Sequence, residues 1–386
     1  MTPVKLPAES PEVWQLEKYH GAANDFLFLS LTDVSLSWDN IGSDWSRRAI
    51  AWCDRRRSIG ADGLVIWKFT KSNASAHSDD SHEKNKNQRL EVAIWNSDGS
   101  VAATCGNALR CVALALWRRG FWDGSCALPV YYPTQEIFGI QSAIALGSAP
   151  FATLIGHVAT PSQTRKRATF EVCMGAPRFL GALQTPWNES LCEAINGLLK
   201  KWKPTLGQDV HCDSATFVQL ANPHLVMFLR DITADDPVLA LQDFLNAEGQ
   251  QIKDTVAQSP NPEFAHNPES VPKSEFQKLG DLNLGALFER AGSQSNPHVL
   301  VVHERGAGVT QACGSGCTAA YAAQLQHDAA KGSEIALNPE ESMGPNARAT
   351  PKAFRMPGGD LTMRKSDNGN YIMGGPAEFI AAVHIE

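Results

Sequence analysis

Two segments of this 386-residue chain repeat one pattern, and the repeat constrains the fold more than any other feature. Residues 92–117 read VAIWNSDGSVAATCGNALRCVALALW, and residues 299–325 read VLVVHERGAGVTQACGSGCTAAYAAQL. In each segment an apolar run typical of a strand ends at a polar residue, Asn96 or Glu304, and a Cys-Gly pair follows nine residues later. A run of small and apolar residues then predicts a helix. Such a repeat indicates two copies of one structural unit.

A second pair of similar segments lies upstream of the two copies and extends the repeat. Residues 23–28 read ANDFLF, and residues 221–226 read ANPHLV. Short predicted strands, among them residues 26–29, 64–67 and 92–95, combine with two prominent helices after the Cys-Gly pairs. We therefore expect an α+β fold with two domains that face each other, rather than a regularly alternating α/β fold.

Two polar segments interrupt the repeat. Residues 71–88 contain almost no apolar residue, and residues 246–278 are rich in Pro, Gln, Asn and Glu. Segments of this composition cannot bury enough apolar surface to fold by themselves. We expect both to be surface loops, the second of them a flexible insertion.

The charge balance excludes several classes of function. Lys and Arg number 34 against 41 Asp and Glu, so the net charge of −7 gives no basic field for nucleic acid or an anionic membrane surface. The chain has no apolar run long enough to span a membrane and no signal peptide at its start, so we expect a cytoplasmic protein. Nine cysteines in a chain of this length fit reduced thiols better than a disulfide framework.

A cysteine at the start of a helix has a distinct chemistry. Unpaired backbone N–H groups and the positive end of the helix dipole lower the pKa of the thiol, and the same N–H groups bind carboxylates. If Cys105 and Cys313 face each other across a cleft, one thiolate can remove an α-proton while the other thiol donates one to the opposite face. Gly106, Gly314 and Gly316 would let a substrate approach the backbone. This reaction needs no metal, pyridoxal or nicotinamide, so we expect no cofactor.

Structural roles compete with these chemical roles. A cysteine is more often a small buried apolar residue than a catalyst. We assign that structural role to the other seven, Cys53, Cys111, Cys126, Cys173, Cys192, Cys212 and Cys317. A zinc site at Cys313 and Cys317 lacks a second ligand pair at suitable spacing.

Three further features have two interpretations or a weak signal. The sequence Gly306-x-Gly308 lacks the third glycine of a dinucleotide-binding loop, because residue 311 is Gln. His224 is as well suited to hold the end of a strand as to touch a substrate. Arg305 is either a carboxylate clamp or a solvated side chain, and its position in the repeat favours the clamp.

Nine ordered motifs resemble those of the diaminopimelate epimerase family, pyridoxal-independent isomerases of bacterial lysine and peptidoglycan-precursor synthesis. They are HGAANDF (20–26), IGADG (59–63), NSDGS (96–100), CGNALRC (105–111), NPH (222–224), ERGAG (304–308), ACGSG (312–316), GGDL (358–361) and GPAE (375–378). The resemblance covers most of the chain outside the two polar segments.

The resemblance implies two pseudo-symmetric domains, each a strongly curved, mainly antiparallel sheet wrapped around a central helix, with the active site in the cleft between them. We expect the first domain at residues 1–145, rejoined by a C-terminal segment at residues 371–386, and the second at residues 146–370. A homodimer is also implied.

The resemblance further implies that Cys105 and Cys313 interconvert LL-2,6-diaminopimelate and meso-diaminopimelate by exchanging the α-proton. The residues expected to hold the substrate are Asn24, Asn96, Gly106, Asn107, Asn222, Asn296, Glu304, Arg305, Gly314 and Ser315, with His224 behind them.

Two departures from the family pattern keep alternatives open. The family usually has Gly-Leu-Gly where this chain has Gly21-Ala22-Ala23, so we expect a strained or shifted turn there. Asn296 is reached only after an offset from the expected position. A related racemase for another amino acid, with an altered distal pocket, is therefore one alternative. A non-catalytic or redox thiol protein is another, although the retention of both Cys-Gly pairs argues against it.

Overall fold

The structure is a computed structural model that describes most of the chain. The described residues are 13–32, 38, 44–71, 88–102, 104–133, 150–159, 164–179, 186–220, 222–258, 282–289, 297–330 and 351–385. The chain forms two compact units: unit 1 contains Met1–Cys173 and Gly374–Glu386, and unit 2 contains Met174–Met373. The expected domain boundary at residues 145 and 146 lies outside the described residues.

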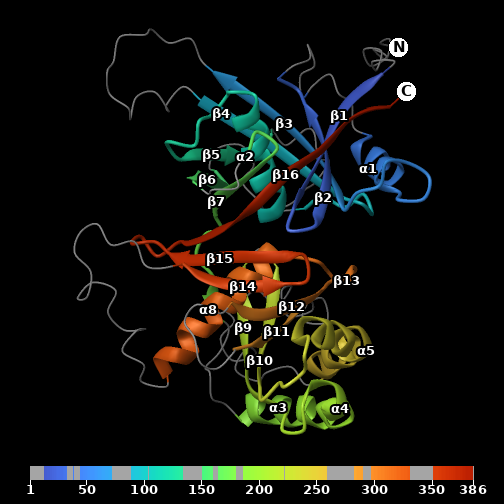
Figure 1. The fold of residues 1–386 in the computed structure, drawn as a ribbon, viewed down its shortest axis with the longest axis vertical. Helices are drawn as coiled ribbons and strands as arrows, with labels where there is room; N and C mark the ends of the chain where they lie inside the picture. Colours follow the sequence, from blue (N-terminus) through green and yellow to red (C-terminus); the bar gives the residue numbers. More distant parts are fainter. Residues whose placement is uncertain are drawn as a thin grey trace, which may run out of the picture. The chain divides into compact units, whose positions relative to one another are not determined.

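Unit 1 is built around a mainly antiparallel set of strands (Figure 1). Its described strands are β1 (Trp14–Gly21), β2 (Asn24–Ser30), β3 (Gly63–Lys71), β4 (Gln88–Asn96), β5 (Leu128–Tyr131), β6 (Ala152–Val158), β7 (Arg167–Cys173) and most of β16 (Tyr371–Ile385). They pair in the order β1 to β7, and β16 pairs with β1. The three predicted strands at residues 26–29, 64–67 and 92–95 are confirmed as parts of β2, β3 and β4.

Helix α2 (Gly106–Arg118) lies at the centre of unit 1, and α1 (Trp45–Cys53) packs on β3 and β4. Every residue of α2 from Gly106 to Leu116 is buried, and the helix contacts β1, β2, β6 and β7. Its only charged residue in this stretch, Arg110, is 0% exposed and donates from Nε to the carbonyl of Pro376 at 3.3 Å. The small and apolar residues after Cys105 are thus explained by burial on every side.

Unit 2 has a similar construction. Its described strands are β8 (Arg178–Phe179), β9 (His211–Gln219), β10 (Pro223–Arg230), β11 (Asn283–Phe288), β12 (His298–Glu304), β13 (Gly308–Val309), β14 (Lys352–Met356) and β15 (Gly359–Lys365). Its described helices are α3 (Pro186–Leu199), the 3-10 helix η2 (Lys200–Trp202), α4 (Lys203–Leu206), α5 (Pro237–Gln258) and α8 (Gly314–Ala330). The alanine-rich α8 is the counterpart of α2: it contacts β9, β10, β11, β12 and β15.

The same series of strand pairings occurs in both units. In unit 1, β1–β2 is antiparallel, β2–β3 parallel, β3–β4 antiparallel, β4–β5 parallel and β5–β6 antiparallel. In unit 2 the series β9–β10, β10–β11, β11–β12, β12–β14 and β14–β15 repeats that order of directions. The second parallel pairing in each series is reached through the helix after the Cys-Gly pair, α2 or α8. The expected α+β class is confirmed.

The expected surface insertion at residues 246–278 is wrong for its first part. Residues 246–258 form the second half of α5, where Ile252 and Val256 are buried in the core of unit 2. These two apolar residues are four apart and therefore lie on one face of the helix. Glu248 and Lys253 are buried as well, and most of the remaining residues of this half are exposed. Residues 259–278 and most of the polar segment at 71–88 lie outside the described residues.

Candidate functional site

Cys105 lies at the N-cap of α2, and its side chain is half-buried. Its backbone is extended, with φ −146° and ψ 105°, and its carbonyl accepts the N–H of Leu109 at 2.9 Å. Gly106 and Asn107 follow as buried residues of the first helical turn. Because the first N–H groups of a helix have no partner within the helix, this turn is chemically suited to a carboxylate.

The structure brings Asn24 and Asn96 to the same end of three adjacent strands. Asn24 begins β2, and Asn96 ends β4. Asp62, the residue before β3, links the two strands: its N–H donates to the carbonyl of Asp25 at 2.8 Å, and its carbonyl accepts the N–H of Ser97 at 3.0 Å. The two predicted binding residues of unit 1 therefore lie at the same end of the sheet, although 72 positions separate them in the sequence.

The turn before Asn24 is strained, as the departure from the family pattern predicted. Asn24 pairs with Gly21 across a two-residue hairpin loop, and both loop residues, Ala22 and Ala23, have positive φ, 54° and 63°. A two-residue hairpin of this kind normally has Gly or Asn at these positions. The buried Oδ1 atom of Asn24 has no hydrogen-bond partner among the described residues, so the turn holds a polar atom that a ligand could satisfy.

A network of charged residues fixes the strand ends around Asn24. The Asp25 carboxylate lies 2.8 Å from Lys18 Nζ and 2.5 Å from Arg55 Nη2, which also lies 2.8 Å from Asp62 Oδ1. Burial acts against the charged form of Asp25, but hydrogen bonds from Arg55 and Lys18 lower its pKa to about 2. Gly60 has a φ of +75°, and a side chain there would meet the Arg55 backbone, which accounts for the glycine of the IGADG motif.

Asn96 is exposed and is oriented by the turn that follows it. Its Nδ2 donates to Ser100 Oγ at 2.9 Å, and Ser100 Oγ in turn donates to Asp98 Oδ1 at 2.6 Å. The NSDGS motif therefore forms a compact hydrogen-bonded turn that orients the amide at the end of β4.

Cys313 precedes α8 and is 4% exposed, so it is more deeply buried than Cys105. Its Sγ accepts the N–H of Gly316 at 3.3 Å and lies 3.4 Å from Ser315 Oγ. Both contacts favour the thiolate, but burial and the neighbouring Glu304 carboxylate outweigh them and raise the pKa of Cys313 well above its usual value. The expected lowering of the pKa at a helix start is therefore wrong for Cys313, because desolvation opposes the charged form.

Of the two glycines at the second helix start, Gly316 has surroundings that differ from those expected. Gly314 and Ser315 form the first turn of α8, as predicted. A side chain at Gly316, however, would come within 2.8 Å of Val302 Cγ2 and 3.2 Å of Cys313 Sγ. Gly316 thus makes room for packing between α8 and β12 rather than for the approach of a substrate.

Glu304 and Arg305 lie at the hairpin that joins β12 to β13. Glu304 pairs with Gly308, and its Oε1 accepts a hydrogen bond from Thr310 Oγ1 at 2.6 Å. The backbone N–H of Arg305 donates to Asn283 Oδ1 at 2.8 Å. The ERGAG motif thus holds a carboxylate and a guanidinium on one turn.

Asn222, His224 and Asn283 lie at one end of the neighbouring strands β10 and β11. Asn222 is exposed just before β10, whereas His224 is 1% exposed and pairs with Asn283 across the two strands. Burial lowers the pKa of His224 to about 3, so the imidazole is neutral. The Nε2 atom of His224 and the Nδ2 atom of Asn283 are buried without a hydrogen-bond partner among the described residues.

Asn283 is the residue that the sequence interpretation missed. The predicted Asn296 lies outside the described residues, whereas Asn283 contacts the backbone of the ERGAG turn directly. A signal was present: Asn283 stands before the apolar run LGALF, just as Asn24 and Asn222 stand before theirs. Within unit 2 the structure brings together Asn283, His224 and the Glu304–Arg305 turn.

Among the described residues, no group of three or more His, Cys, Asp and Glu side chains is placed to hold a metal ion. None of the helices in the described ranges is long and apolar enough to cross a membrane. Cys111 and Cys317 are completely buried within α2 and α8, and burial raises the pKa of Cys111. Their structural assignment agrees with these surroundings.

Comparisons with known proteins agree with the motifs. The family model described as diaminopimelate epimerase matches residues 16–128. A diaminopimelate epimerase of Bacillus pumilus is 26% identical over 95% of this chain and 96% of its own length. One from Phocaeicola vulgatus is 27% identical over 96% of this chain and 97% of its own. Among solved structures, the PhzF-family phenazine biosynthesis protein of Bacillus anthracis covers 97% of this chain with a TM-score of 0.52 at 9% identity, which is a likeness of fold alone.

The fold, the paired helix starts and these relatives define an enzyme of the isomerase class, an amino-acid epimerase. Within that class, the chain is similar to the diaminopimelate epimerase family, as its motifs predicted.

Proposed function

We propose that this chain interconverts LL-2,6-diaminopimelate and meso-diaminopimelate in the cytoplasm, for lysine and peptidoglycan-precursor synthesis. The names of relatives that span almost the whole chain support this substrate. The observation that carries the proposal is that a Cys-Gly pair begins the buried helix of each unit, α2 and α8. Inversion at a carbon requires a base on one face and an acid on the other, and two thiols supply both.

In this proposal the two units are pseudo-symmetric domains, and the α-carbon of the substrate lies between Cys105 and Cys313. One sulfur removes the α-proton as a thiolate, and the other donates its proton from the opposite face. The roles reverse when the reaction runs backwards. No cofactor takes part.

The surroundings of Cys313 suggest how its role is controlled. Its raised pKa means that the sulfur carries a proton before substrate binds, which suits the acid. A substrate ammonium paired with Glu304 would offset the carboxylate charge that contributes to this high pKa. Binding of substrate would then bring Cys313 closer to the thiolate state and allow it to act as the base.

The remaining predicted residues divide between the two ends of the substrate. We propose that the backbone N–H groups of Gly106, Asn107, Gly314 and Ser315 bind the carboxylate at the reacting centre. We propose that the other candidates bind the ammonium groups and the distal carboxylate: Asn24, Asn96, Asn222, Asn283, Glu304 and Arg305. Asn283 replaces Asn296 in this set because it contacts the Arg305 turn. His224 supports Asn283 from the neighbouring strand.

The test is exchange of the α-proton with solvent. Purified reduced protein is incubated with LL- or meso-diaminopimelate in D₂O, and deuterium incorporation is followed together with epimerisation. We expect both in the wild type and in Cys126→Ser, a matched control at a half-buried cysteine outside the two helix starts. Undiminished epimerisation in Cys105→Ser and Cys313→Ser would overturn the mechanism.

The same assay tests the substrate. Exchange with a different amino acid, and none with diaminopimelate, would identify a related two-cysteine racemase instead. The homodimer that the family resemblance implies is a separate proposal, and a mass measurement in solution by light scattering tests it.

A further inference from the structure

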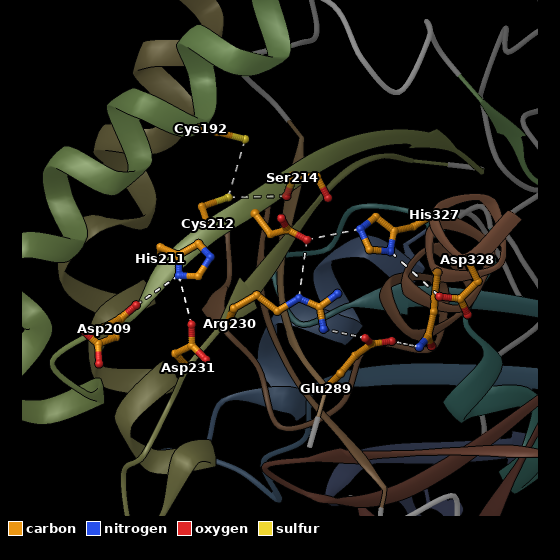
Figure 2. Close-up of polar contacts among 12 residues, drawn as sticks. Cys192, Asp209, His211, Cys212, Ser214, Arg230, Asp231, Glu289, His327 and Asp328 are labelled. Atoms are coloured by element: carbon orange, nitrogen blue, oxygen red, sulfur yellow. Dashed lines mark hydrogen bonds and ion pairs between the residues drawn. The ribbon is translucent and has the colours of Figure 1, made fainter. Parts of the chain in front are cut away.

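A second pair of thiols lies in unit 2, away from the helix starts. Cys192 is on α3 and Cys212 is the second residue of β9, and their Sγ atoms are 3.8 Å apart (Figure 2). A disulfide bond requires the sulfurs to approach to about 2.05 Å. The remaining gap is short enough for a rotation of the side chains and a small shift of the backbone to close it.

The backbone around the pair is held in place by Asn196, one helical turn after Cys192. The N–H of Cys212 donates to Asn196 Oδ1 at 2.6 Å, and Asn196 Nδ2 donates to the carbonyl of Cys212 at 3.3 Å. The two hydrogen bonds join α3 to β9 beside the sulfurs. The contact between the thiols is therefore built into the packing of these two elements rather than being a chance approach of mobile side chains.

The two thiols differ in exposure and in proton affinity. Cys192 is half-buried, whereas Cys212 is buried and also contacts the carbonyl of Ser214 at 3.4 Å (Figure 2). The hydrogen bond from Cys212 lowers the pKa of Cys192, and this effect outweighs burial and the charge of Asp213, which act in the opposite direction. The same hydrogen bond, burial and the charge of Asp213 all raise the pKa of Cys212. A more accessible thiol that ionises first and a buried thiol beside it are the arrangement of an attacking and a resolving cysteine.

We propose that Cys192 and Cys212 form a redox-active dithiol site whose reactant is a low-molecular-weight disulfide. The Cys192 thiolate attacks one sulfur of the reactant, forms a mixed disulfide and releases one thiolate. Cys212 then loses its proton and attacks Cys192 Sγ, which forms the Cys192–Cys212 bond and releases the second thiolate. Overall, two protein thiols are oxidised to a disulfide and the reactant is reduced to two thiols.

The position of the pair predicts what its oxidation does. The bond would tie α3 to β9 and close a loop of 21 residues, from 192 to 212, which restricts the unfolded chain. Cys212 lies near the start of β9, whereas the turn that carries Asn222 follows the end of that strand. We therefore expect oxidation of this pair to raise thermal stability and to leave proton exchange at the substrate unchanged.

The experiment treats the reduced full-length protein with oxidised glutathione, blocks the remaining thiols and maps peptides without reduction. It is run on Cys105→Ser/Cys313→Ser, so that the thiols at the helix starts cannot compete. We expect a peptide that joins Cys192 to Cys212 and a rise in Tm of about 5 °C that dithiothreitol reverses. Cys192→Ser in the same background should lose both effects, and Cys126→Ser should keep them.

Two further results test which cysteine attacks first and whether the two cysteines form a disulfide at all. Cys212→Ser should accumulate a mixed disulfide with glutathione at Cys192, because the resolving thiol is missing. If Cys212→Ser does not fold, the peptide map and the Cys192→Ser variant remain decisive. Separate peptides for Cys192 and Cys212 under conditions that oxidise Cys126 or Cys173 would overturn the proposal.

Discussion

Cys105 and Cys313 lie at helix starts with the same backbone hydrogen bond, yet the residues nine positions before them differ in charge. In both, the carbonyl of the cysteine accepts the N–H four residues later at 2.9 Å. The strand before Cys105 ends in Asn96, whose neutral amide bonds to Ser100. In unit 2, β12 ends in Glu304, whose carboxylate helps to raise the pKa of the buried Cys313 thiol.

This difference teaches that a repeated fold does not repeat the polar residues that end its strands. The backbone fixes the position of each sulfur, and in unit 2 the residue nine positions upstream, Glu304, also raises the pKa of the thiol. A reaction that moves a proton from one face of a carbon to the other requires unlike partners at any one moment. The asymmetry between Asn96 and Glu304 suits that requirement.

Removing either sulfur is the most severe test of whether the two helix starts act together in catalysis. Because the pKa of a serine hydroxyl is far above that of a thiol, we expect Cys105→Ser and Cys313→Ser each to lower kcat by about 10²–10⁴-fold. Fixed-time assays of epimerisation measure the loss of kcat, with Cys126→Ser as the control. Activity in either variant within a few-fold of the wild type would show that the two helix starts are not partners in catalysis.

Replacing Glu304 with glutamine makes the second helix start resemble the first. Glu304→Gln should lower the pKa of Cys313 towards its usual value, because a negative neighbour is removed. It should also lower kcat/KM by about 10–100-fold, the value of a hydrogen bond to a charged group. The pH dependence of iodoacetamide labelling at Cys313, in a Cys105→Ser background, measures the first effect.

Glu193→Gln, on the exposed surface of α3, is the control for that substitution. An unchanged labelling profile in Glu304→Gln would mean that burial alone sets the proton affinity of Cys313. The comparison between Asn96 and Glu304 would then lose its physical basis.

Asn283 sharpens the comparison at the second site, where its side chain supports the Arg305 turn. Asn283→Ala leaves the N–H of Arg305 without its acceptor, so we expect KM to rise by about tenfold with a smaller change in kcat. Asn283→Asp keeps the acceptor oxygen and should recover part of the loss. Steady-state kinetics with diaminopimelate test both variants, and equal KM values in alanine and wild-type forms would remove Asn283 from the site.

The strand ends around Asn24 in unit 1 are held by the ion pairs of Asp25, so the stability of the protein should depend on pH. The pKa of Asp25 is lowered to about 2, so the stability it contributes is present above about pH 4, its unfolded range, and is lost as pH falls through 2. Asp25→Asn should therefore reduce the free energy of unfolding by about 2 kcal/mol at pH 7, with the difference vanishing near pH 2. Burial raises the pKa of Asp62, so Asp62 gives the opposite dependence of stability on pH. The difference between Asp25→Asn and the wild type therefore isolates the contribution of Asp25 better than the pH profile of the wild type alone.

Urea titrations at a series of pH values measure this effect. Asp360→Asn removes an exposed ion pair with Arg355 and should change stability little at any pH, because exposed pairs contribute little. A constant difference between Asp25→Asn and the wild type from pH 7 to pH 2 would contradict the assignment of the low pKa to Asp25.

Local patterns in the sequence predicted much of this fold and part of the site. The strands β2, β3 and β4 and both buried helices were predictable because their apolar residues are contiguous. The parallel pairings could not be predicted, since the strands they join are separated by helices. The second half of α5 was missed because few of its buried residues have apolar side chains and its composition is polar.

The two helix starts were predictable from the sequence, but the proton affinity of Cys313 was not. A helix start can be read from Cys-Gly and the residues after it. The depth at which Cys313 is buried and its distance from the Glu304 carboxylate depend on how β12 packs on α8, which no local pattern contains. Asn283 was missed for a related reason: its contact with Arg305 joins two residues that are 22 positions apart in the sequence.

The hairpin at Ala22 and Ala23 has a consequence for protein engineering. Each alanine with positive φ costs about 1–2 kcal/mol relative to an ordinary conformation, and the surrounding packing must supply that energy. Ala23 is exposed, so a glycine there would relieve strain without removing buried contacts. Ala23→Gly is therefore the simplest substitution for a more heat-resistant form of the enzyme. Because it lies one residue before Asn24, measuring its activity together with its Tm would show whether the strained turn matters for the position of the Asn24 amide.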